Sequence, residues 1–401
     1  MPAIVQNGSE ERLTKDIFEH TGITYAVESN QGHEWLVMLN LQYRMHQDIA
    51  DFVSEYMYQG GLKTSEKIAD SRNEIAACHP CPDAAMSLMD LSGMYSVCTK
   101  TKDGSRINIM SALMCLRLVE KNIDQYEVGI ITPYSAQSRL ILSMIRDIQE
   151  YDKRWLKVSS ATVHQFQGSE KPVIIYDAVD CFRMPYPGTL LTSLKNDTAN
   201  RLFNVALTRA KGKFVLLANI DFLERKNISK KLLFTKAINE IRKEGHNIAG
   251  NYVLDEMMPA NMEKPIVYIE DRKTSWQHFI SDIKMAGNRI HIDVPDVIDD
   301  NDEAIGELAE LLAQKRNNGV EICIRIPEEV DLPDGLQEYT RITGYVTNPI
   351  TIIDKKTIWF GQPLCSADFI SEGEIIETKY FPCMRFVGTH TARSMQAFFE
   401  I

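Results

Sequence analysis

Short apolar runs alternate with amphipathic segments from about residue 35 to residue 225. Runs rich in Val, Ile and Leu without polar alternation are typical of strands that are buried on both faces of a parallel sheet. The expected strands are 35–39, 86–91, 127–132, 172–179 and 213–219. Apolar positions at helical spacing predict helices over 46–58, 106–121, 134–148 and 200–210. This order of elements predicts an α/β fold in which helices cover a parallel sheet.

The pattern changes after residue 225. Residues 226–264 are helical at first and then polar, with Gly245, Gly250 and Pro259 as breaks, so we expect a helical connector there. A second α/β pattern occupies 265–401. Its expected strands are 266–270, 289–294, 319–326, 341–346, 350–354 and 357–361, and its expected helices are 275–286 and 302–316. The chain is therefore expected to hold two α/β domains, the first over 1–225 with an incomplete N-terminal edge.

The composition is that of ordinary globular protein, with 44% hydrophobic and 25% charged residues. It excludes collagen, long disorder and coiled coil. No apolar run reaches the roughly 18–20 residues of a membrane helix, so we expect no membrane partner. The first residues also carry no secretory signal. Eight cysteines, mostly inside apolar segments, favour a cytoplasmic location over a disulfide framework.

Charge is distributed unevenly along the chain. The whole chain has a net charge of −11, while residues 265–401 hold 23 acidic and 13 basic residues, a net charge of −10. The first 264 residues are therefore close to neutral, and they include the basic stretch 201–243. This asymmetry favours nucleic-acid binding by the first part only.

Four blocks carry candidate chemistry: QYRMH at 42–46, TPYSAQ at 132–137, TVHQFQGSE at 162–170 and NVALTRA at 204–210. In order and spacing they resemble motifs of the second RecA-like domain of superfamily 1B helicases, the group with the nonsense-mediated-decay and Senataxin-like helicases. The resemblance covers about residues 1–220. It implies a RecA-like sheet of the P-loop NTPase type and 5′→3′ movement on single-stranded nucleic acid.

Hydrolysis of a nucleoside triphosphate needs cations that face the γ-phosphate, and the planar fork of arginine pairs well with phosphate oxygens. Arg44 and Arg209 are the candidates, and the matching arginines of the family reach the γ-phosphate from the second domain. For an isolated arginine, a surface salt bridge would be the simpler explanation. The resemblance also implies nucleotide contacts by five further residues, with Glu170 near the ribose: Gln42, Tyr43, Gln167, Gly168 and Glu170. ATP and Mg²⁺ are the implied cofactors.

The same resemblance implies contacts with single-stranded nucleic acid by six residues: Thr132, Pro133, Tyr134, Gln137, Thr162 and His164. Hydroxyl groups at strand ends can hold phosphates without reading sequence, and an aromatic ring such as Tyr134 can stack on a base. Packing of Tyr134 in the protein is an equal alternative. His164 stands where the family often has Asp, and a structural role is open for it too. DNA and RNA are not distinguished by such contacts.

The phosphate-binding half of an NTPase is missing from these 401 residues. They contain no G-x-x-x-x-G-K-[ST] loop, because GGLKTS at 60–65 has the wrong spacing, and no acidic Walker B strand precedes QYRMH. The opening MPAIVQN resembles the sequence that follows the end of the first motor domain. We therefore expect a first RecA-like domain as a partner, encoded upstream or in another chain, and negligible ATPase activity without it.

Residues 265–401 resemble the phospholipase D-like fold, whose motif is H-x-K-x-x-x-x-D. Alignment on Asp354 places Thr347 at the His position and Pro349 at the Lys position, so both catalytic residue types are missing. A non-catalytic docking or dimerisation domain is expected, with pairing of two copies as in single-motif members of that family. A generic α/β domain is the alternative.

Two function classes rival the helicase half. The first is a non-catalytic module that binds nucleic acid or a partner protein. The second is a nuclease that acts through unrecognised residues of 265–401. The C-x-x-C pair Cys78 and Cys81 lacks a second close pair of ligands, so no metal site is expected.

Overall fold

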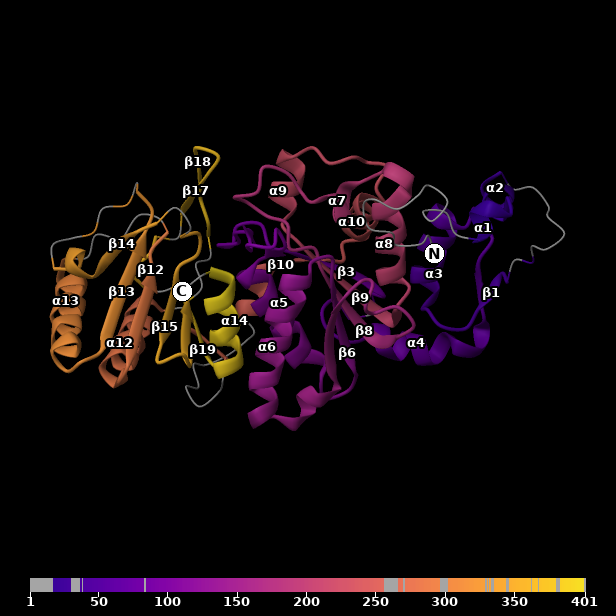
Figure 1. Ribbon diagram of the computed structural model, residues 1–401. Helices are drawn as coiled ribbons and strands as arrows, with labels where there is room; N and C mark the ends of the chain where they lie inside the picture. The colour runs from indigo at the N-terminus through magenta and orange to yellow at the C-terminus, as the bar shows by residue number, and fades with distance from the viewer. Residues whose placement is uncertain are drawn as a thin grey trace.

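The computed structural model describes residues 17–29, 37, 39–82, 84–255, 266–269, 271–295, 302–328, 330, 332, 335–343, 346–361, 363–366, 368–379 and 383–399. The chain forms two α/β units that lie side by side (Figure 1). Among the described helices, none combines the length and the apolar character that crossing a bilayer demands. The opening MPAIVQN and most of the acidic stretch 296–303 lie outside the described residues.

The first unit is built on a six-stranded sheet in the order β10-β3-β9-β8-β6-β7, and all of its neighbours are parallel. Four expected strands are confirmed: β3 (Met86–Asp90), β6 (Val128–Thr132), β8 (Lys171–Asp177) and β9 (Ala210–Ala218). Residues 37 and 39 of the expected strand 35–39 are not in a strand, and the rest of that strand lies outside the described residues. Two strands were not expected, β7 (Val158–Thr162) and β10 (Asn247–Ala249).

Helices cover both faces of this sheet. Ser111 of α5 (Ile109–Asn122) and Gln137 of α6 (Ser135–Tyr151) reach Asp177 on one face. On the other face Tyr176 packs against Phe203 of α8 (Thr198–Leu207) and Phe234 of α10 (Leu233–Lys243). The alternation of strand side chains places successive residues on opposite faces. The helices of this unit are α1 (Ile17–His20), α2 (Ile23–Glu28), α3 (Gln47–Met57), α4 (Ala69–Ala76), α5 (Ile109–Asn122), α6 (Ser135–Tyr151), α7 (Thr189–Thr192), α8 (Thr198–Leu207), α9 (Ile220–Arg225), α10 (Leu233–Lys243) and α11 (Gly250–Asp255).

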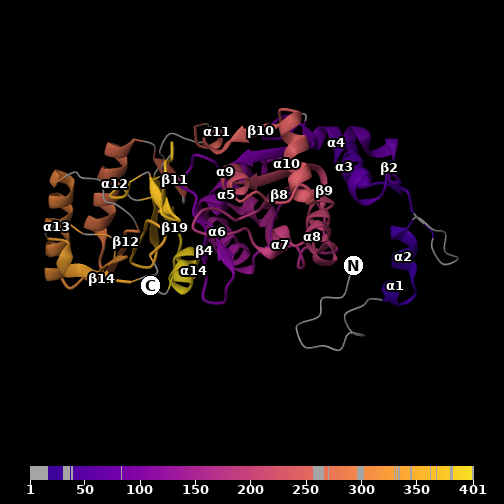
Figure 2. The ribbon, with the colours of Figure 1, turned by 90° about the horizontal axis from the view of Figure 1, so that it is seen from above.

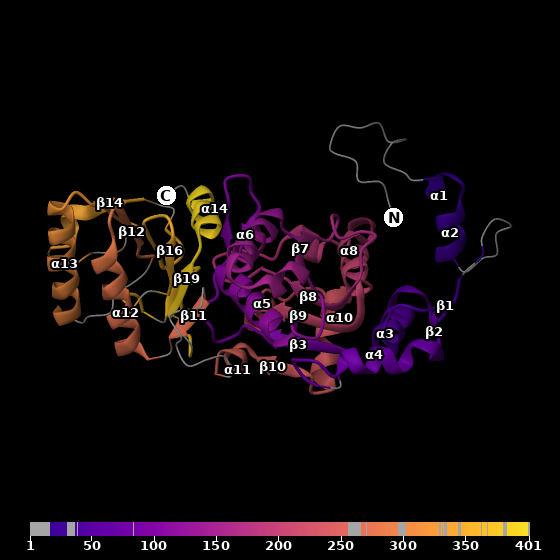
Figure 3. The same cartoon turned by 90° about the horizontal axis from the view of Figure 1, so that it is seen from below.

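Two small ladders complete the first unit: β1 (Leu41–Gln42) with β2 (Lys63–Thr64), and β4 (Thr99–Lys100) with β5 (Arg106–Ile107). Figures 2 and 3 show α1 and α2 at the end of the molecule that is farthest from the second unit.

The segment expected as a connector is largely part of the first unit. Helix α10 buries Phe234, Ala237 and Ile241 in the core, and β10 pairs with β3 as the edge strand of the sheet. The first unit therefore continues past the expected boundary at 225 and includes α11, which ends at residue 255 and packs on α5. The sequence interpretation failed here because a three-residue edge strand has no apolar run to mark it.

The second unit has a seven-stranded mixed sheet in the order β11-β19-β16-β15-β12-β13-β14. Helices α12 (Arg272–Met285) and α13 (Asp302–Asn317) cover its outer face (Figure 1). Its strands are β11 (Ile266–Ile269), β12 (Arg289–Asp293), β13 (Glu321–Ile326), β14 (Thr340–Ile342), β15 (Ile350–Ile353), β16 (Thr357–Phe360) and β19 (Cys383–Val387), with a separate hairpin of β17 (Phe369–Ser371) and β18 (Glu374–Ile376). The strand expected over 341–346 is shorter than predicted.

The C-terminal helix α14 (Thr389–Phe399) joins the two units. It lies between α6 of the first unit and the inner face of the second sheet (Figure 1). One apolar core runs through this seam, since Ile350, Met384 and Phe386 belong to the same buried cluster as residues of the first sheet. The second unit is thus docked on the first through a shared core and is not joined to it by a linker alone.

Candidate functional site

The parallel strands place the candidate residues at two opposite edges of the first sheet. Glu170 comes directly before β8 and Arg209 directly before β9, and the first residues of these strands, Lys171 and Ala210, are paired. Thr132 and Thr162 are paired at the opposite edge, where β6 and β7 end. The residues expected to contact the nucleotide and those expected to contact single-stranded nucleic acid therefore lie at opposite ends of the β-strands.

Four cations gather around one carboxylate at the first edge, and we call them the arginine cluster: Arg44, Arg72, Arg209 and Lys211. Nε of Arg44 lies 2.6 Å from Oε2 of Glu170, and Nζ of Lys211 lies 2.9 Å from Oε1. The hydrogen bond from Lys211, with the charge of Arg44, holds the pKa of Glu170 below its usual range. The side chain of Arg44 keeps 42% of its surface exposed, so a phosphate can reach it.

Arg209 follows Thr208, whose carbonyl accepts from Nη1 of Arg44 at 3.4 Å. Arg209 donates from Nε to the carbonyl of Val205 at 3.1 Å and from Nη1 to the carbonyl of Ser169 at 3.3 Å. Burial lowers the pKa of Arg209, and the positive charge of Arg44 lowers it further. Two guanidinium groups whose positive charges oppose each other form a site that an anion would stabilise.

Gln42 does not face the cluster but holds the turn that carries Arg44. Its Oε1 accepts from the amides of Arg44 and Met45, both at 2.7 Å, and its Nε2 donates to Thr64. Tyr43, by contrast, is 55% exposed and stands free to meet a ligand or another domain. Of the two residues expected to frame the nucleotide, Gln42 is thus bonded within the protein and Tyr43 is exposed.

The segment after β7 crosses a face of the sheet on its way to the cluster. Phe166 is buried against Gly129 of β6, where a Cβ atom would lie 2.6 Å from the Phe166 ring. Around this anchor His164, Gln167 and Gly168 are exposed, and Gly168 has a φ of +82°, which glycine adopts without strain. Only glycine at 129 lets the segment lie so close to the strand.

The side chains expected to bind nucleic acid, at the opposite end of the sheet, are mostly buried. Thr132 and Gln137 have no exposed surface and Tyr134 has 7%. The Tyr134 hydroxyl donates to Asp180 at 2.7 Å, and Nε2 of Gln137 donates to Asp177 at 2.6 Å. Tyr134 and Gln137 thus satisfy two buried carboxylates, of β8 and of the segment after it, while Oγ1 of Thr132 accepts from the Tyr134 amide at 3.4 Å. The expectation that these three side chains contact nucleic acid is therefore corrected, because all three are buried.

Pro133 is also buried, whereas Thr162 is partly exposed and bonds its Oγ1 to Gln165. Asp180 is further held by Arg106 and by the amide of Gly188. Burial raises the pKa of Asp177 to about 6. Of the six residues expected at nucleic acid, Thr162 and His164 are the two with accessible side chains.

The sequence interpretation missed Arg72 and Lys211. Arg72 is on α4 and donates from Nε to the carbonyl of Arg44 at 2.6 Å. Lys211 follows Arg209 by two residues, and a signal existed there because alternation in a strand places 209 and 211 on one face. No periodicity pointed to Arg72, since only the fold brings α4 to the turn of Arg44.

The aligned phospholipase D positions form no cluster of catalytic groups. Asp354 accepts backbone amides from Gly287, Asn288 and Arg289 at 2.8–2.9 Å and so supports a turn. Oγ1 of Thr347 lies 2.8 Å from Oγ1 of Thr99 in the first unit. Both residues therefore have structural partners.

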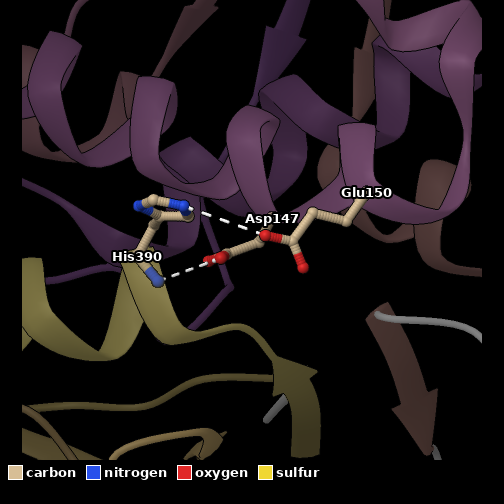
Figure 4. Close-up of side chains that lie close together, drawn as sticks. All are labelled: Asp147, Glu150 and His390. Carbon is tan, nitrogen blue, oxygen red and sulfur yellow. Dashed lines mark hydrogen bonds and ion pairs between the residues drawn. The ribbon is translucent and has the colours of Figure 1, made fainter.

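The described residues contain one group with metal-ligand chemistry, Asp147, Glu150 and His390, at the seam (Figure 4). Asp147 is already engaged as the N-terminal cap of α14, because it accepts from the amides of His390 and Thr391. Glu150 is exposed, His390 is half-buried, and the two side chains lie 3.9 Å apart. Cys78 and Cys81 are not in this group, and burial raises the pKa of Cys78 to about 11, which disfavours a metal-binding thiolate.

Residues 21–221 match a family described as "AAA domain". Among curated relatives, the chain is 26% identical over 286 residues to the regulator of nonsense transcripts 1 homolog of Drosophila melanogaster, which is 70% of this chain and 23% of that protein. It is 28% identical to the ATP-dependent helicase NAM7 of Saccharomyces cerevisiae, over 59% of this chain and 23% of the relative. The helicase sen1 of Schizosaccharomyces pombe is 25% identical, over 47% of this chain and 11% of the relative.

The chain thus spans less than a quarter of each of these relatives. Among solved structures, NucT from Helicobacter pylori covers 34% of this chain and 91% of its own at 14% identity, with a TM-score of 0.24. A score this low assigns no fold to the second unit. The family match covers half of the chain, and with the motif blocks and the helicase relatives it shows that the chain belongs to the AAA domain family, among superfamily 1 helicases.

Proposed function

We propose that this chain supplies the second motor domain of an ATP-dependent helicase or translocase that acts on single-stranded nucleic acid. The carrying observation is the convergence of Arg44 and Arg209, which are 165 residues apart in the sequence, at one end of the sheet, where Nη1 of Arg44 donates to the carbonyl of Thr208 at 3.4 Å. Their charges would stabilise the γ-phosphate in the transition state, where negative charge develops. Glu170, which is bonded to Arg44 and Lys211, would accept a hydrogen bond from a ribose hydroxyl.

The arginine cluster supplies cations but no loop that could enclose phosphates. It offers one carboxylate, Glu170, which two cations already neutralise, so Mg²⁺ would be held by the first motor domain. ATP fits the chemistry of this edge as an anion, and Mg²⁺ would add charge stabilisation there when both domains are present. We propose that Gln167 and Gly168, which are exposed beside the cluster, couple nucleotide binding to the binding of single-stranded nucleic acid.

Exposed apolar side chains beside the cluster support a partner domain on this face. Leu41 and Tyr43 flank the turn of Arg44 and are 46% and 55% exposed. Tyr58, 38% exposed, accepts from Asn204 of α8 near Arg209. Apolar side chains around functional cations are typical of a surface that another domain covers. We propose that the first RecA-like domain is this partner.

The nucleic-acid surface proposed for this chain is smaller than the motif blocks imply. Thr162 and His164 at the end of β7 are its accessible side chains, and the buried Thr132, Tyr134 and Gln137 shape the backbone beneath them. Contacts of this kind bind phosphates without reading sequence. The cytoplasm remains the proposed location, since all eight cysteines are unpaired.

For the second unit we propose a docking role on a degenerate phospholipase D-like fold. The inner face of its sheet is covered by α14 and the first unit, so two copies would have to pair through other surfaces, and a homodimer is not part of the proposal.

Complementation tests the proposed function. The 401-residue chain is mixed with, or fused to, the first motor domain of a related helicase, and ATP hydrolysis is measured with a single-stranded oligonucleotide. We expect hydrolysis that is lost in Arg44→Ala and in Arg209→Ala and kept in Arg146→Ala, an exposed arginine on α6. Salt-sensitive binding of the oligonucleotide with no gain of hydrolysis would favour the rival function, a non-catalytic binding module.

A further inference from the structure

Helix α4 touches both elements that carry the candidate arginines. On one side it packs on β9, three residues after Arg209. A Cβ atom at Gly212 would lie 2.4 Å from Cβ of Ile75 and 2.9 Å from the carbonyl oxygen of Arg72, so the contact requires glycine. On the other side its side chains reach the turn that carries Arg44. The helix therefore connects the turn that carries Arg44 to strand β9, which begins directly after Arg209.

Arg72 makes the closest of these contacts with the turn. Its Nε donates to the carbonyl of Arg44 at 2.6 Å, and its Nη2 donates to the carbonyl of Tyr43 at 3.5 Å. Its Nη1 is bonded to Ser71 at 3.2 Å. All three guanidinium nitrogens are thus engaged with protein groups, and burial lowers the pKa of Arg72.

Two further bonds make the turn part of the same unit. Asn73 of α4 lies 2.9 Å from Nε2 of His46, and the His46 amide donates to the carbonyl of Lys211 at 2.7 Å. Gln42 holds the turn from its other side through the Arg44 and Met45 amides. The backbone of the turn is therefore fixed to α4 and β9, while the Arg44 side chain keeps its exposed surface.

We propose that Arg72 is a positioning residue that sets where Arg44 stands relative to Arg209. Its guanidinium holds the backbone carbonyl of Arg44, and α4 holds the strand that begins after Arg209. A polyphosphate that bridges the two arginines would then meet them at a fixed separation without the cost of ordering the turn. This inference rests on the proposed function, because it assigns Arg72 to the same anion site.

The test uses the full 401-residue chain and inorganic tripolyphosphate as the probe, with binding measured by calorimetry. The variants are Arg72→Ala, Arg72→Lys, Arg44→Ala, Arg209→Ala, the double variant of Arg44 and Arg72, and Arg146→Ala as a matched control. Loss of a charge-assisted bond predicts about tenfold or greater weakening in Arg44→Ala and in Arg72→Ala. Arg72→Lys, which can donate to one carbonyl, recovers part of that loss.

The double variant separates positioning from direct contact. If Arg72 acts through Arg44, the double variant binds no more weakly than Arg44→Ala. Losses that multiply would mean that Arg72 contacts the anion itself, and this overturns the proposal. An affinity of Arg72→Ala equal to that of Arg146→Ala overturns it too, and leaves the proposed function standing if Arg44→Ala and Arg209→Ala still weaken binding.

A second measurement tests the positioning role of Arg72 without any bound anion. Hydrogen exchange of residues 41–46 in the free chain is expected to speed up in Arg72→Ala and less in Arg72→Lys, with residues 86–90 of β3 unchanged as a check on folding. If Arg44→Ala and Arg209→Ala leave tripolyphosphate binding intact, the proposed function fails. Hydrogen exchange of residues 41–46 alone then tests whether Arg72 positions the turn. Unchanged exchange at 41–46 overturns the positioning role.

Discussion

Asp147 is expected to hold the two units together, and its replacement by alanine should weaken the seam. The carboxylate is 1% exposed and accepts from the amide of His390 at 2.9 Å and from the amide and hydroxyl of Thr391 at 2.7 and 2.6 Å. Loss of a helix N-cap costs about 1 kcal/mol, and a hydrogen bond to a charged group is worth about 1.5–3 kcal/mol. Because such losses overlap, we expect a destabilisation of about 3–4 kcal/mol.

Urea unfolding, followed by hydrogen exchange of α14, measures this effect. Glu150→Ala is the matched control: it is one turn away on α6, its side chain is 59% exposed, and its 3.9 Å contact with His390 is worth at most about 0.5 kcal/mol (Figure 4). Gly388→Ala should act like Asp147→Ala, because its Cβ would lie 2.1 Å from Asp147 Oδ2. Equal unfolding free energies for Asp147→Ala and Glu150→Ala would refute the reasoning.

Three further predictions concern the first unit. Gly129→Ala should destabilise it by about 1–3 kcal/mol in urea unfolding, since the new Cβ would meet Phe166 at 2.6 Å and Ile174 at 2.8 Å, and a wild-type midpoint would contradict this. Lys213→Met should cost about 2–4 kcal/mol in the same assay, because Nζ donates to the carbonyls of Ala76, Cys81 and Ala84 inside the protein, and a loss below about 1 kcal/mol would speak against it. Burial raises the pKa of Asp177 from 3.8 to about 6, so its contribution to stability is present below pH 3.8 and is lost as the pH rises through 6. Relative to wild type, Asp177→Asn should therefore gain up to about 3 kcal/mol of unfolding free energy between pH 4 and pH 7, and a difference that stays constant with pH would count against that pKa.

Much of the first fold could be predicted because its strands are buried on both faces. Continuous apolar runs marked β3, β6, β8 and β9. Strand β7, with the sequence VSSAT at the sheet edge, has too few apolar residues to be seen, and β10 is too short. The sequence does not predict helix α14, because its partner is α6, about 240 residues earlier in the chain, and no local pattern shows such a contact.

The candidate site was predictable where chemistry and local sequence agree. The motif blocks point to Arg44, Arg209 and Glu170, and the fold brings these residues together at one end of the sheet. For Tyr134 and Gln137 the sequence is ambiguous, because a polar or aromatic residue at the end of a β-strand can contact nucleic acid or bond inside the protein. Only the fold shows the buried carboxylates of Asp180 and Asp177 to which they bond. Arg72 needed the fold, since α4 meets the turn of Arg44 only in three dimensions.

The central proposal is that the arginines of this chain complete an NTPase site whose phosphate-binding loop a first motor domain would supply. Steady-state ATP hydrolysis by the purified 401-residue chain, with Mg²⁺ and a single-stranded oligonucleotide present, tests it most directly. Since cations without a phosphate-binding loop have no enclosed phosphate to act on, no hydrolysis above background is expected. Hydrolysis by this chain alone that Arg209→Ala abolishes would contradict the account.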